Sequence, residues 1–360
     1  MSQTQALQKI LVEFNIDGQL LALDPIKRGH INQTFVSCWS QASGERRYVH
    51  QRINHSIFKD VKGLMSNVEK VCSHLGRLYA GLSQRRALQL VPTRRGNSYL
   101  ETQEGTYWRT YAYVEGTETF DVCPSVRHAY EAAQALAHFV VDLSALSVSD
   151  FCEPIPKFQD ARFRYEGLDD AIKNDRASRL ASVGPEIEFA LAQKAAACVV
   201  VDTVKSGAVP CRITHADPKV NNVLFDPLTQ QGLGVVDLDT VMPGSLLYDF
   251  GDLVRSTAVP SAEDETDLRK VGMSLEYYTA LLKGYRESAR NLLTKSEIEL
   301  LPLAPRALAL TLGVRFLADH LNGDTYFQVH RPGQNLDRAR AQFQIARSME
   351  AQEKMMRAEP

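Results

Sequence analysis

The sequence predicts an α+β protein with two lobes, a small β-rich N-terminal lobe and a larger, mostly helical C-terminal lobe. The first observation is a series of β-rich segments in the first third of the 360 residues. The second is a change to helical periodicity after Gly116. The third is one strand-like interruption of the helical part, which carries a cluster of polar residues. We therefore expect a lobe boundary between Val114 and Thr117, with domains at residues 1–115 and 116–360.

Four strand candidates and one helix account for the N-terminal lobe. Residues 29–40 and 46–54 are β-rich, and the QASGE segment between them suits a hairpin turn. Further strands are expected within ALQLVPTRR and over residues 107–116. Helical spacing predicts a helix over residues 60–79 with its apolar side formed by Val61, Leu64, Met65, Val68, Val71, Cys72 and Leu75. The lobe should be a small sheet with one helix across it.

Helices dominate the rest of the chain. Residues 125–146 and 186–204 have helical patterns, as does most of 264–356. Prolines should interrupt that last stretch at Pro302, Pro305 and Pro332. The segment around residues 211–239 has short strand-like runs instead, so its polar residues should lie in loops that leave strands.

The composition limits the classes of partner. Of the residues, 44% are hydrophobic and 23% charged, as in ordinary globular proteins. Because 41 basic and 43 acidic residues are interspersed, with a formal net charge of −2, we expect neither a nucleic-acid partner nor a membrane surface. No stretch approaches the roughly 18 apolar residues of a membrane span. Six scattered cysteines fit reduced thiols. We therefore expect a cytoplasmic protein that acts on small molecules.

The stretch ITHADPKVNNVLFD combines residues that suit phosphoryl transfer. His215, Asp217 and Asn222 have the spacing H-x-D-x-x-x-x-N, and Asp237 follows Asn222 by fifteen residues at the end of an apolar run. Phosphoryl transfer needs an aspartate that accepts the hydroxyl proton and oxygen ligands that hold Mg²⁺ on the phosphates. We interpret Asp217 as the base and Asn222 and Asp237 as the metal ligands, while His215 should brace the loop.

Other interpretations of this stretch stay open. Asp-Pro and Asn-Asn are common turn dipeptides, and an aspartate that ends a strand often caps the next element. Asp239 is expected on the same side as Asp237, where it would hold a second metal or a backbone amide. Lys219 would meet the γ-phosphate or face water. The β-rich segment upstream and the second aspartate at the end of a strand favour the catalytic interpretation.

The sequence also resembles a known superfamily. THADPKVNNVLFD followed by VVDLDTVMPGSLLYDFGDLVR resembles the aminoglycoside phosphotransferases and choline kinases. GHINQTF, RYVHQRINHSIFKD and GVRFLADHLNGDTYF narrow the resemblance to the bacterial N-acetylhexosamine 1-kinases, over roughly residues 8–350. The resemblance implies a bilobal, protein-kinase-like fold. It also implies that ATP and Mg²⁺ are used to phosphorylate the anomeric C1 hydroxyl of N-acetylglucosamine or N-acetylgalactosamine.

The same resemblance implies residues for the acceptor side. Asp217 matches the base, and His30, Arg315 and Tyr326 match sugar contacts; Asp239 is a further candidate on this side. On an unbroken helix, Arg315 and Tyr326 would share a face, although the NGD segment between them suggests a break. Without the resemblance, Arg315 would more simply pair with an acid one turn along the helix, and Tyr326 would be a core residue.

The nucleotide side departs from the pattern of protein kinases. The strand that should carry a phosphate-binding lysine has Gln51 and Arg52 instead, and only one of these can face the cleft because side chains alternate along a strand. Glu69 on the following helix is either the partner of Arg52 or a solvated charge. Similar glutamines occur in the resembling sugar kinases, so we interpret the missing lysine as a subfamily trait.

The remaining nucleotide contacts are expected in the first strands and at the lobe boundary. Gly29 allows a close backbone approach to the nucleotide, and Asn32 and Thr34 can add side-chain donors. Backbone groups from Tyr111 to Tyr113 are expected to bind adenine.

Two other functions remain possible at this stage. The same residues would serve a kinase of another small alcohol, such as choline, ethanolamine, homoserine, a thiosugar or an aminoglycoside. The missing lysine alone would suit a nucleotide-binding pseudokinase, but a pseudokinase has no need for a base and both metal ligands. The sequence therefore favours an enzyme whose substrate is a small sugar or amino-alcohol.

Overall fold

The N-terminal region is built on one antiparallel sheet. The computed structural model describes residues 3–26, 31–82 and 86–358. Within them the sheet has six strands in the order β1-β2-β3-β6-β4, with β5 also pairing with β6. The strands are β1 (Gln19–Ile26), β2 (Gln33–Gln41), β3 (Gly44–Ile53), β4 (Leu90–Val91), β5 (Leu100–Glu101) and β6 (Tyr107–Ala112).

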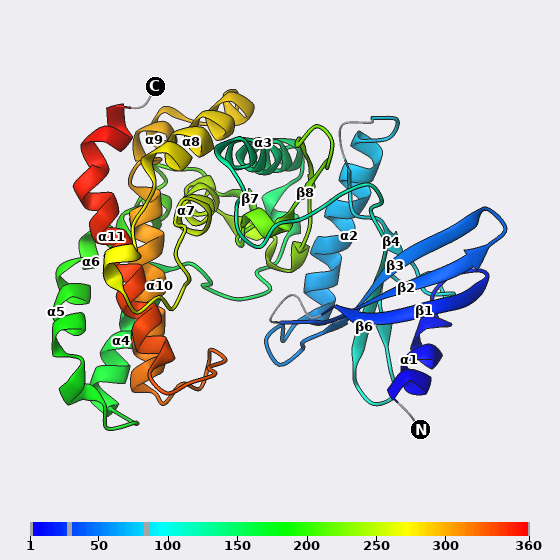
Figure 1. Ribbon diagram of the computed structural model, residues 1–360, viewed down its shortest axis with the longest axis horizontal. Helices are drawn as coiled ribbons and strands as arrows, with labels where there is room; N and C mark the ends of the chain where they lie inside the picture. The colour runs from blue at the N-terminus through cyan, green and yellow to red at the C-terminus, as the bar shows by residue number, and fades with distance from the viewer. Residues whose placement is uncertain (1–2, 27–30, 83–85, 359–360) are drawn as a thin grey trace.

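A helix covers each face of this sheet (Figure 1). The predicted helix is α2 (Val61–Leu78), which begins after Asp60, whose side chain accepts from the Gly63 amide, and all seven of its predicted apolar residues are buried. The other face packs on α1 (Gln3–Leu11), which the sequence analysis did not predict. A second apolar cluster lies on this side and consists of Leu7, Leu11, Phe14, Ile16, Trp39 and Trp108.

The strand register decides which side chains face which helix. Strands β2 and β3 form the predicted hairpin, with Gln41 opposite Gly44. Thr34 lies opposite Gln51, and Gln51 lies opposite Arg109 of β6, so these three side chains share the face that packs on α2. Arg52 lies opposite Trp108, on the α1 face.

The C-terminal region is mostly helical, with two small antiparallel sheets. Its helices are α3 (Val126–Leu143), α4 (Ala161–Asn174), α5 (Gly184–Ala192), α6 (Lys194–Lys205), α7 (Leu246–Thr257), α8 (Leu275–Ala289), α9 (Lys295–Leu300), α10 (Ala304–Leu321) and α11 (Gln334–Ala358). Strand β7 (Arg212–Thr214) pairs with β10 (Met242–Gly244), and β8 (Val223–Phe225) pairs with β9 (Gly232–Val235). Short 3₁₀ turns, among them η3 (Val220–Asn222) and η4 (Leu238–Thr240), connect these strands.

Most of the predicted helix boundaries hold in this region. The pattern over residues 186–204 forms two helices, α5 and α6, which meet at Gln193. Pro305 stands in the first turn of α10, where a missing amide costs no helix hydrogen bond. The fold class, α+β with a β-rich N-terminal region and a helical C-terminal region, is confirmed.

The two regions share one apolar core. Residues of α2 such as Val68 and residues of the helical region such as Leu136 and Phe250 belong to a single buried cluster. Polar contacts cross as well, because the side-chain amide of Asn67 on α2 donates to the carbonyl oxygens of Cys152 and Val241, at 2.8 and 2.9 Å. The helix α2 therefore ties the sheet to the helical region.

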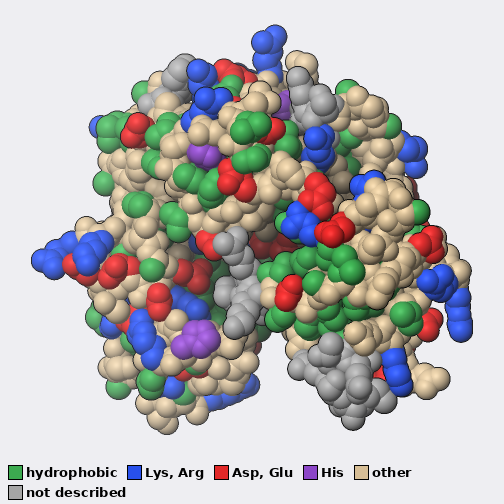
Figure 2. All heavy atoms as spheres, turned by 45° about the vertical axis from the view of Figure 1, so that its right-hand side comes forward, with side chains coloured by type: hydrophobic (Ala, Val, Ile, Leu, Met, Phe, Trp, Pro, Cys, Tyr) green, Lys and Arg blue, Asp and Glu red, His purple; other side chains and the backbone are tan. Residues whose placement is uncertain are grey.

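On the face shown in Figure 2, basic and acidic side chains are interspersed, so neither charge forms a large patch of its own. The surface is hollowed between the two regions. None of the helices in the described part of the chain is long and apolar enough to span a membrane.

Candidate active site

Helix α7 fixes the backbone of the loop that follows β7. The carboxylate of Asp249 in the first turn of α7 accepts hydrogen bonds from the amides of His215 and Ala216, each at 2.8 Å. The hydroxyl of Thr240 donates to the carbonyl oxygen of His215 at 2.8 Å. Burial raises the pKa of Asp249 to about 6. Ala216 has a φ of 63°, a left-handed conformation, so these bonds hold a backbone that alanine rarely adopts.

His215 braces this loop through both ring nitrogens. Its Nε2 lies 2.9 Å from the carbonyl oxygen of Val236, and a carbonyl only accepts, so Nε2 carries the proton. Its Nδ1 then accepts from the amide of Asp217 at 3.3 Å. Because the ring is fully buried and engaged on both sides, it orients the loop and does not face reactants.

Asp217 forms an ion pair with Lys219. The Asp217 carboxylate and the Lys219 ammonium are 2.7 Å apart, and both side chains are partly exposed. Burial opposes ionisation of Asp217, but Lys219 outweighs it and lowers the pKa of the carboxyl below its usual range. The carboxylate is therefore charged at neutral pH and able to accept a proton.

Asn222 is oriented by its side-chain nitrogen, and no hydrogen bond to its amide oxygen is found among the described residues. Its Nδ2 donates to the backbone oxygen of Asp217 at 2.9 Å, which leaves Oδ1 to a ligand. Its own carbonyl accepts from the amide of Val236 at 2.8 Å, which joins η3 to the end of β9. Asp237 follows directly, with a φ of 63°. Loss of solvation, and then the negative charges of Asp239 and Asp217, raise the pKa of Asp237 to about 7.

The side chains of Asn222 and Asp237 match the number of protein ligands that Mg²⁺ usually takes. The part of the chain that the structure describes contains no group of three or more His, Cys, Asp or Glu side chains able to hold a metal. Mg²⁺ usually takes one or two protein oxygens and completes its shell with water and phosphate. Asn222 and Asp237 would supply such a pair, and a divalent cation would relieve the repulsion that raises the pKa of Asp237.

Asp239 faces the N-terminal sheet. Its Oδ1 forms a buried ion pair with Arg109 of β6, and its Oδ2 accepts from Asn32 at 2.6 Å. A second metal, a backbone amide and the acceptor were the expected partners of Asp239, and neither Arg109 nor Asn32 was among them. Asp239 is 3% exposed, and Arg109 is its partner in a buried ion pair.

Arg109 belongs to a hydrogen-bonded network with residues predicted for the nucleotide side. Its Nε and Nη2 donate to Oε1 of Gln51 at 3.0 and 2.8 Å, and Gln51 in turn donates to the hydroxyl of Thr34 at 3.3 Å. Burial opposes the charge of Arg109, but Asp239 outweighs it and raises the pKa of the guanidinium. The sequence analysis missed Arg109, although an arginine at an inward position of the aromatic strand YWRTYAY is an available signal.

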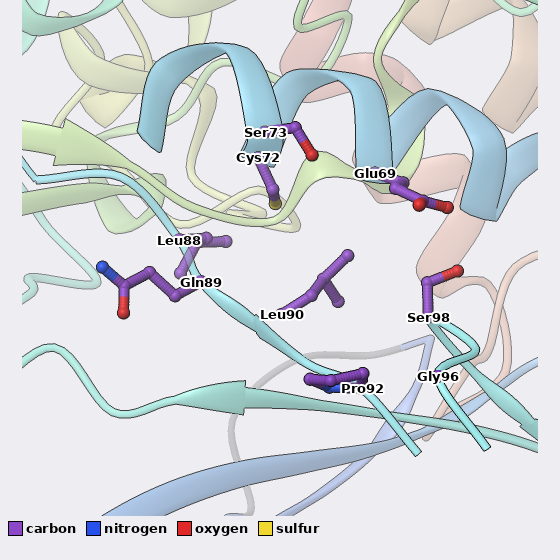
Figure 3. A pocket seen from close by; sticks show the side chains of 9 residues that line it. All are labelled: Glu69, Cys72, Ser73, Leu88, Gln89, Leu90, Pro92, Gly96 and Ser98. Atoms are coloured by element: carbon purple, nitrogen blue, oxygen red, sulfur yellow. The ribbon is translucent and has the colours of Figure 1, made fainter. Parts of the chain in front are cut away.

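Arg52 and Glu69 lie apart from this network. Among the described residues, Arg52 donates a hydrogen bond to Gln33, at 3.4 Å, on the α1 face of the sheet. Glu69 lines a cavity of about 310 Å³ between α2 and the segment around β4, above Ser98 (Figure 3). No ion pair joins Arg52 and Glu69 among the described residues. Of the two alternatives for Glu69, the pair with Arg52 is not formed, because alternation along β3 turns Arg52 away from α2.

The tyrosines at the lobe boundary take different positions. The Tyr111 ring shares the face of Arg109, whose guanidinium carbon is 5.3 Å from the ring centroid, and its hydroxyl has no partner among the described residues. The amide of Tyr113 donates to the carbonyl of Arg47 at 3.0 Å, and the Arg47 guanidinium stacks on its ring at 3.9 Å. Two further predicted residues, Gly29 and His30, lie outside the described residues.

Arg315 and Tyr326 meet across a loop, not along a helix. Helix α10 ends at Leu321, yet the Arg315 guanidinium carbon lies 5.7 Å from the Tyr326 ring centroid. It also lies 5.2 Å from each of the ring centroids of Phe158 and Phe327. Asp319 does not pair with Arg315, because its carboxylate accepts from the amides of Thr325, Tyr326 and Phe327 and so fixes the loop.

This aromatic platform, formed by Phe158, Tyr326 and Phe327, adjoins the Asp217 loop. Gln159, next to Phe158, donates to the carbonyl of Ala216 at 2.7 Å. Arg164 donates to the carbonyl of Phe158 at 2.6 Å, and burial followed by the charge of Arg315 lowers the pKa of Arg164 to about 10. Within the described chain, neither Arg164 nor Arg315 has a carboxylate within ion-pair distance.

The comparisons with known proteins agree with this architecture. Three solved structures superpose over nearly the whole chain at low sequence identity, which shows the fold. A microcompartment-associated aminopropanol kinase has a TM-score of 0.64 at 14% identity, over 99% of each chain. An aminoglycoside phosphotransferase from Alicyclobacillus acidocaldarius has 0.60 at 15%, over 97% of this chain and 95% of that one. An ethanolamine kinase from Plasmodium vivax has 0.56 at 12%, over 89% and 82%.

The fold is therefore that of the two-lobed, protein-kinase-like phosphotransferases, as the sequence predicted. The family model described as "Phosphotransferase enzyme family" matches residues 27–286, which include strands β2 to β6 of the sheet, the Asp217 loop and α7. The chain belongs to the phosphotransferase enzyme family.

Proposed function

We propose that the protein is an ATP-dependent sugar kinase that phosphorylates the anomeric C1 hydroxyl of an N-acetylhexosamine, N-acetylglucosamine or N-acetylgalactosamine. The observation that carries the proposal is the arrangement of Asp217 between an oxygen pair for Mg²⁺, Asn222 and Asp237, and the arginine-bearing aromatic platform. The fold and the family support the transfer of phosphate. The platform supports the class of acceptor.

Asp217 accepts the proton of the C1 hydroxyl while the hydroxyl oxygen attacks the γ-phosphorus. The new bond joins the sugar oxygen to phosphorus, the bond from phosphorus to the β–γ bridging oxygen breaks, and ADP leaves. Mg²⁺, when bound, offsets the negative charge of the phosphates. Lys219, which pairs with Asp217 at 2.7 Å, is proposed to turn to the γ-phosphate once the sugar takes its place beside the base.

The other predicted residues are assigned by the same proposal. Residues 1–115 form the nucleotide lobe and residues 116–360 the catalytic and acceptor lobe. Asn32, Thr34 and Gln51 serve the nucleotide side, where they already belong to one hydrogen-bonded network with Arg109. Backbone groups at the lobe boundary near Tyr113 serve adenine.

The charge beside Asp217 favours a neutral sugar over a cationic amine. Choline, ethanolamine and aminoglycosides are cations, which would need carboxylates or an uncharged aromatic cage. Here the aromatic rings already stack on Arg315, and Arg164 adds a second cation. Arg315 donates hydrogen bonds in a planar fork that suits the hydroxyls and the acetamido oxygen of a sugar.

The acceptor is tested by supplying the purified protein with Mg-ATP and one compound at a time from N-acetylglucosamine, N-acetylgalactosamine, choline, ethanolamine and homoserine. We expect ADP release with an N-acetylhexosamine, and a ³¹P NMR signal of a phosphate on C1. Phosphate on the 6-hydroxyl, or turnover with an amino-alcohol only, would refute the proposed acceptor.

The base is tested by Asp217→Asn. Because the amide cannot accept the proton, we expect kcat to fall by about 10²- to 10⁴-fold while ADP binding, measured by calorimetry, is retained. Asp226→Asn, a change at an exposed turn in the same segment, is the matched control and should keep the wild-type kcat. A kcat of Asp217→Asn within twofold of the wild type would contradict the assignment.

A further inference from the structure

Arg109 is a buried charge with partners from both regions. Its side chain is 1% exposed and is among the largest fully buried side chains of the described residues. Its Nε and Nη2 donate to Gln51 of β3, its Nη1 pairs with Asp239 of η4, and the Met65 sulfur of α2 lies 3.9 Å from Nη1. A buried guanidinium is held in one geometry by such contacts, because leaving any charge unpaired is costly.

Neither residue that could replace the strand lysine supplies a charge at this position. Gln51 faces the site but is neutral, and Arg52 lies on the opposite face of the sheet. Arg109 stands directly opposite Gln51, one strand further along the sheet, and points to the same face. On this face of the sheet, Arg109 of β6 therefore supplies a positive charge, and it contacts Gln51 and Asp239.

The connection from Asp239 to Asp237 is short. Asp237 precedes η4 and Asp239 lies within it, so the position of one carboxylate constrains the other. Arg109 holds one oxygen of Asp239, and Asn32 holds the other at 2.6 Å. Without these partners, the Asp239 charge would repel Asp237 and turn towards solvent, which would move both carboxylates.

We propose that Arg109 is a positioning residue of the nucleotide site, which replaces the missing strand lysine from the neighbouring strand and keeps Asp237 ready for Mg²⁺ by holding Asp239. This inference rests on the proposed function, because it assumes that Mg-nucleotide binds at Asn222 and Asp237. Arg109 does not touch the acceptor, so its effect should fall on the nucleotide alone.

Arg109→Lys tests the inference, because lysine keeps the charge but one ammonium cannot serve both Gln51 and Asp239 as the guanidinium does. Calorimetry measures the dissociation constant of ADP with Mg²⁺ and with EDTA. We expect Mg-ADP affinity to fall by about 10- to 100-fold, as for other partners of metal ligands, and metal-free ADP affinity to change by less than about threefold. The KM for the sugar should stay within about twofold of the wild type.

Arg46→Lys is the matched control, because it makes the same change at an exposed position of β3 and should leave both affinities unchanged. If Arg109→Lys does not fold, Asn32→Ala decides the question, since it removes the other contact of Asp239 but keeps both buried charges. Asn32→Ala should also weaken Mg-ADP more than metal-free ADP.

Three results would overturn the inference. Arg109→Lys with wild-type Mg-ADP affinity, or an equal loss with and without Mg²⁺, would reduce Arg109 to a core residue. A wild-type protein that binds no Mg-ADP would refute the proposed function together with the inference. In contrast, a wild-type protein that binds Mg-ADP but phosphorylates no N-acetylhexosamine would refute the acceptor alone, and the nucleotide measurements would still test Arg109.

Discussion

The two faces of the N-terminal sheet bury polar groups in different ways. On the α1 face, the imidazole of His50 lies between the hydroxyls of Ser37 and Thr110, at 2.7 and 2.8 Å, and all three are neutral and belong to the sheet. On the α2 face, Arg109 is charged, and its counter-charge, Asp239, comes from the helical region. The neutral network lies within the sheet and stabilises the N-terminal region alone. The ionic network joins the sheet to the helical region and fixes the position of one relative to the other.

The largest effect should come from breaking the ionic network. Arg109→Met leaves Asp239 buried without a counter-charge, and we expect a loss of about 3–5 kcal/mol in the free energy of unfolding. The double variant Arg109→Met/Asp239→Asn removes both charges and should recover at least half of that loss. Urea unfolding followed by circular dichroism measures both. A loss below about 1 kcal/mol for Arg109→Met would mean that water replaces the partner of Asp239.

Because it contains His50, the neutral network should make the free energy of unfolding depend on pH. Burial lowers the pKa of His50 to about 3, whereas an unfolded histidine titrates near 6.5. Between those pH values the unfolded chain binds a proton that the folded chain does not, so stability should fall by about 1.4 kcal/mol per pH unit as the pH decreases below 6.5. Other titrating groups also contribute to the dependence of stability on pH. The contribution of His50 is therefore obtained by comparing proteins with and without this histidine.

His50→Gln removes the titrating group and should reduce the slope by that amount between pH 6 and 4. The control Ser37→Ala loses one hydrogen bond to His50 but keeps the imidazole, so it should lower stability at every pH and keep the slope. Identical slopes in His50→Gln and the wild type would show that His50 is protonated in the folded protein.

The smallest effect should come from an exposed ion pair on the same sheet. Arg47 of β3 pairs with Glu115, and the two side chains are 42% and 54% exposed. A double-mutant cycle with Arg47→Ala and Glu115→Ala should give a coupling free energy of about 0.2–1 kcal/mol, which decreases in high salt. The same cycle applied to Arg109 and Asp239 should exceed it several-fold, and equal couplings would remove the distinction between the two networks.

Local patterns in the sequence predicted much of the fold. The helix α2 was predicted from seven apolar residues at helical spacing, because burial of one side of a helix imposes that period. The hairpin of β2 and β3 followed from its turn residues. In contrast, α1 and β1 were missed, since a nine-residue helix and a mostly exposed strand with a proline carry weak periodic signals.

The Asp217 loop was also accessible from the sequence, because all its parts lie within 25 residues and each follows a strand or turn. The structure brings Asn222, Asp217 and Val236 into one hydrogen-bonded unit, as their spacing suggested. Asp249, which anchors the loop from 34 residues away in the chain, has no such local signature.

Arg109 was missed for a different reason. The missing cation was expected on the strand where protein kinases carry it, so only Gln51 and Arg52 were considered. The pairing of β3 with β6 across 58 residues, which places Arg109 opposite Gln51, is a property of the tertiary fold. When the cation lies on the neighbouring strand, the spacing of residues within a sequence motif does not reveal it.

The Arg109–Asp239 pair has a consequence for how such chains can be recombined. A crossover between two family members within residues 113–125, the connection between β6 and α3, would join a sheet from one parent to a loop from the other. If only one parent has this arginine, the chimera would bury a single charge without its partner. Libraries of chimeras at this junction should therefore be depleted of such mismatched pairs, and exchange of the lobe should succeed when residues 109 and 239 are inherited together.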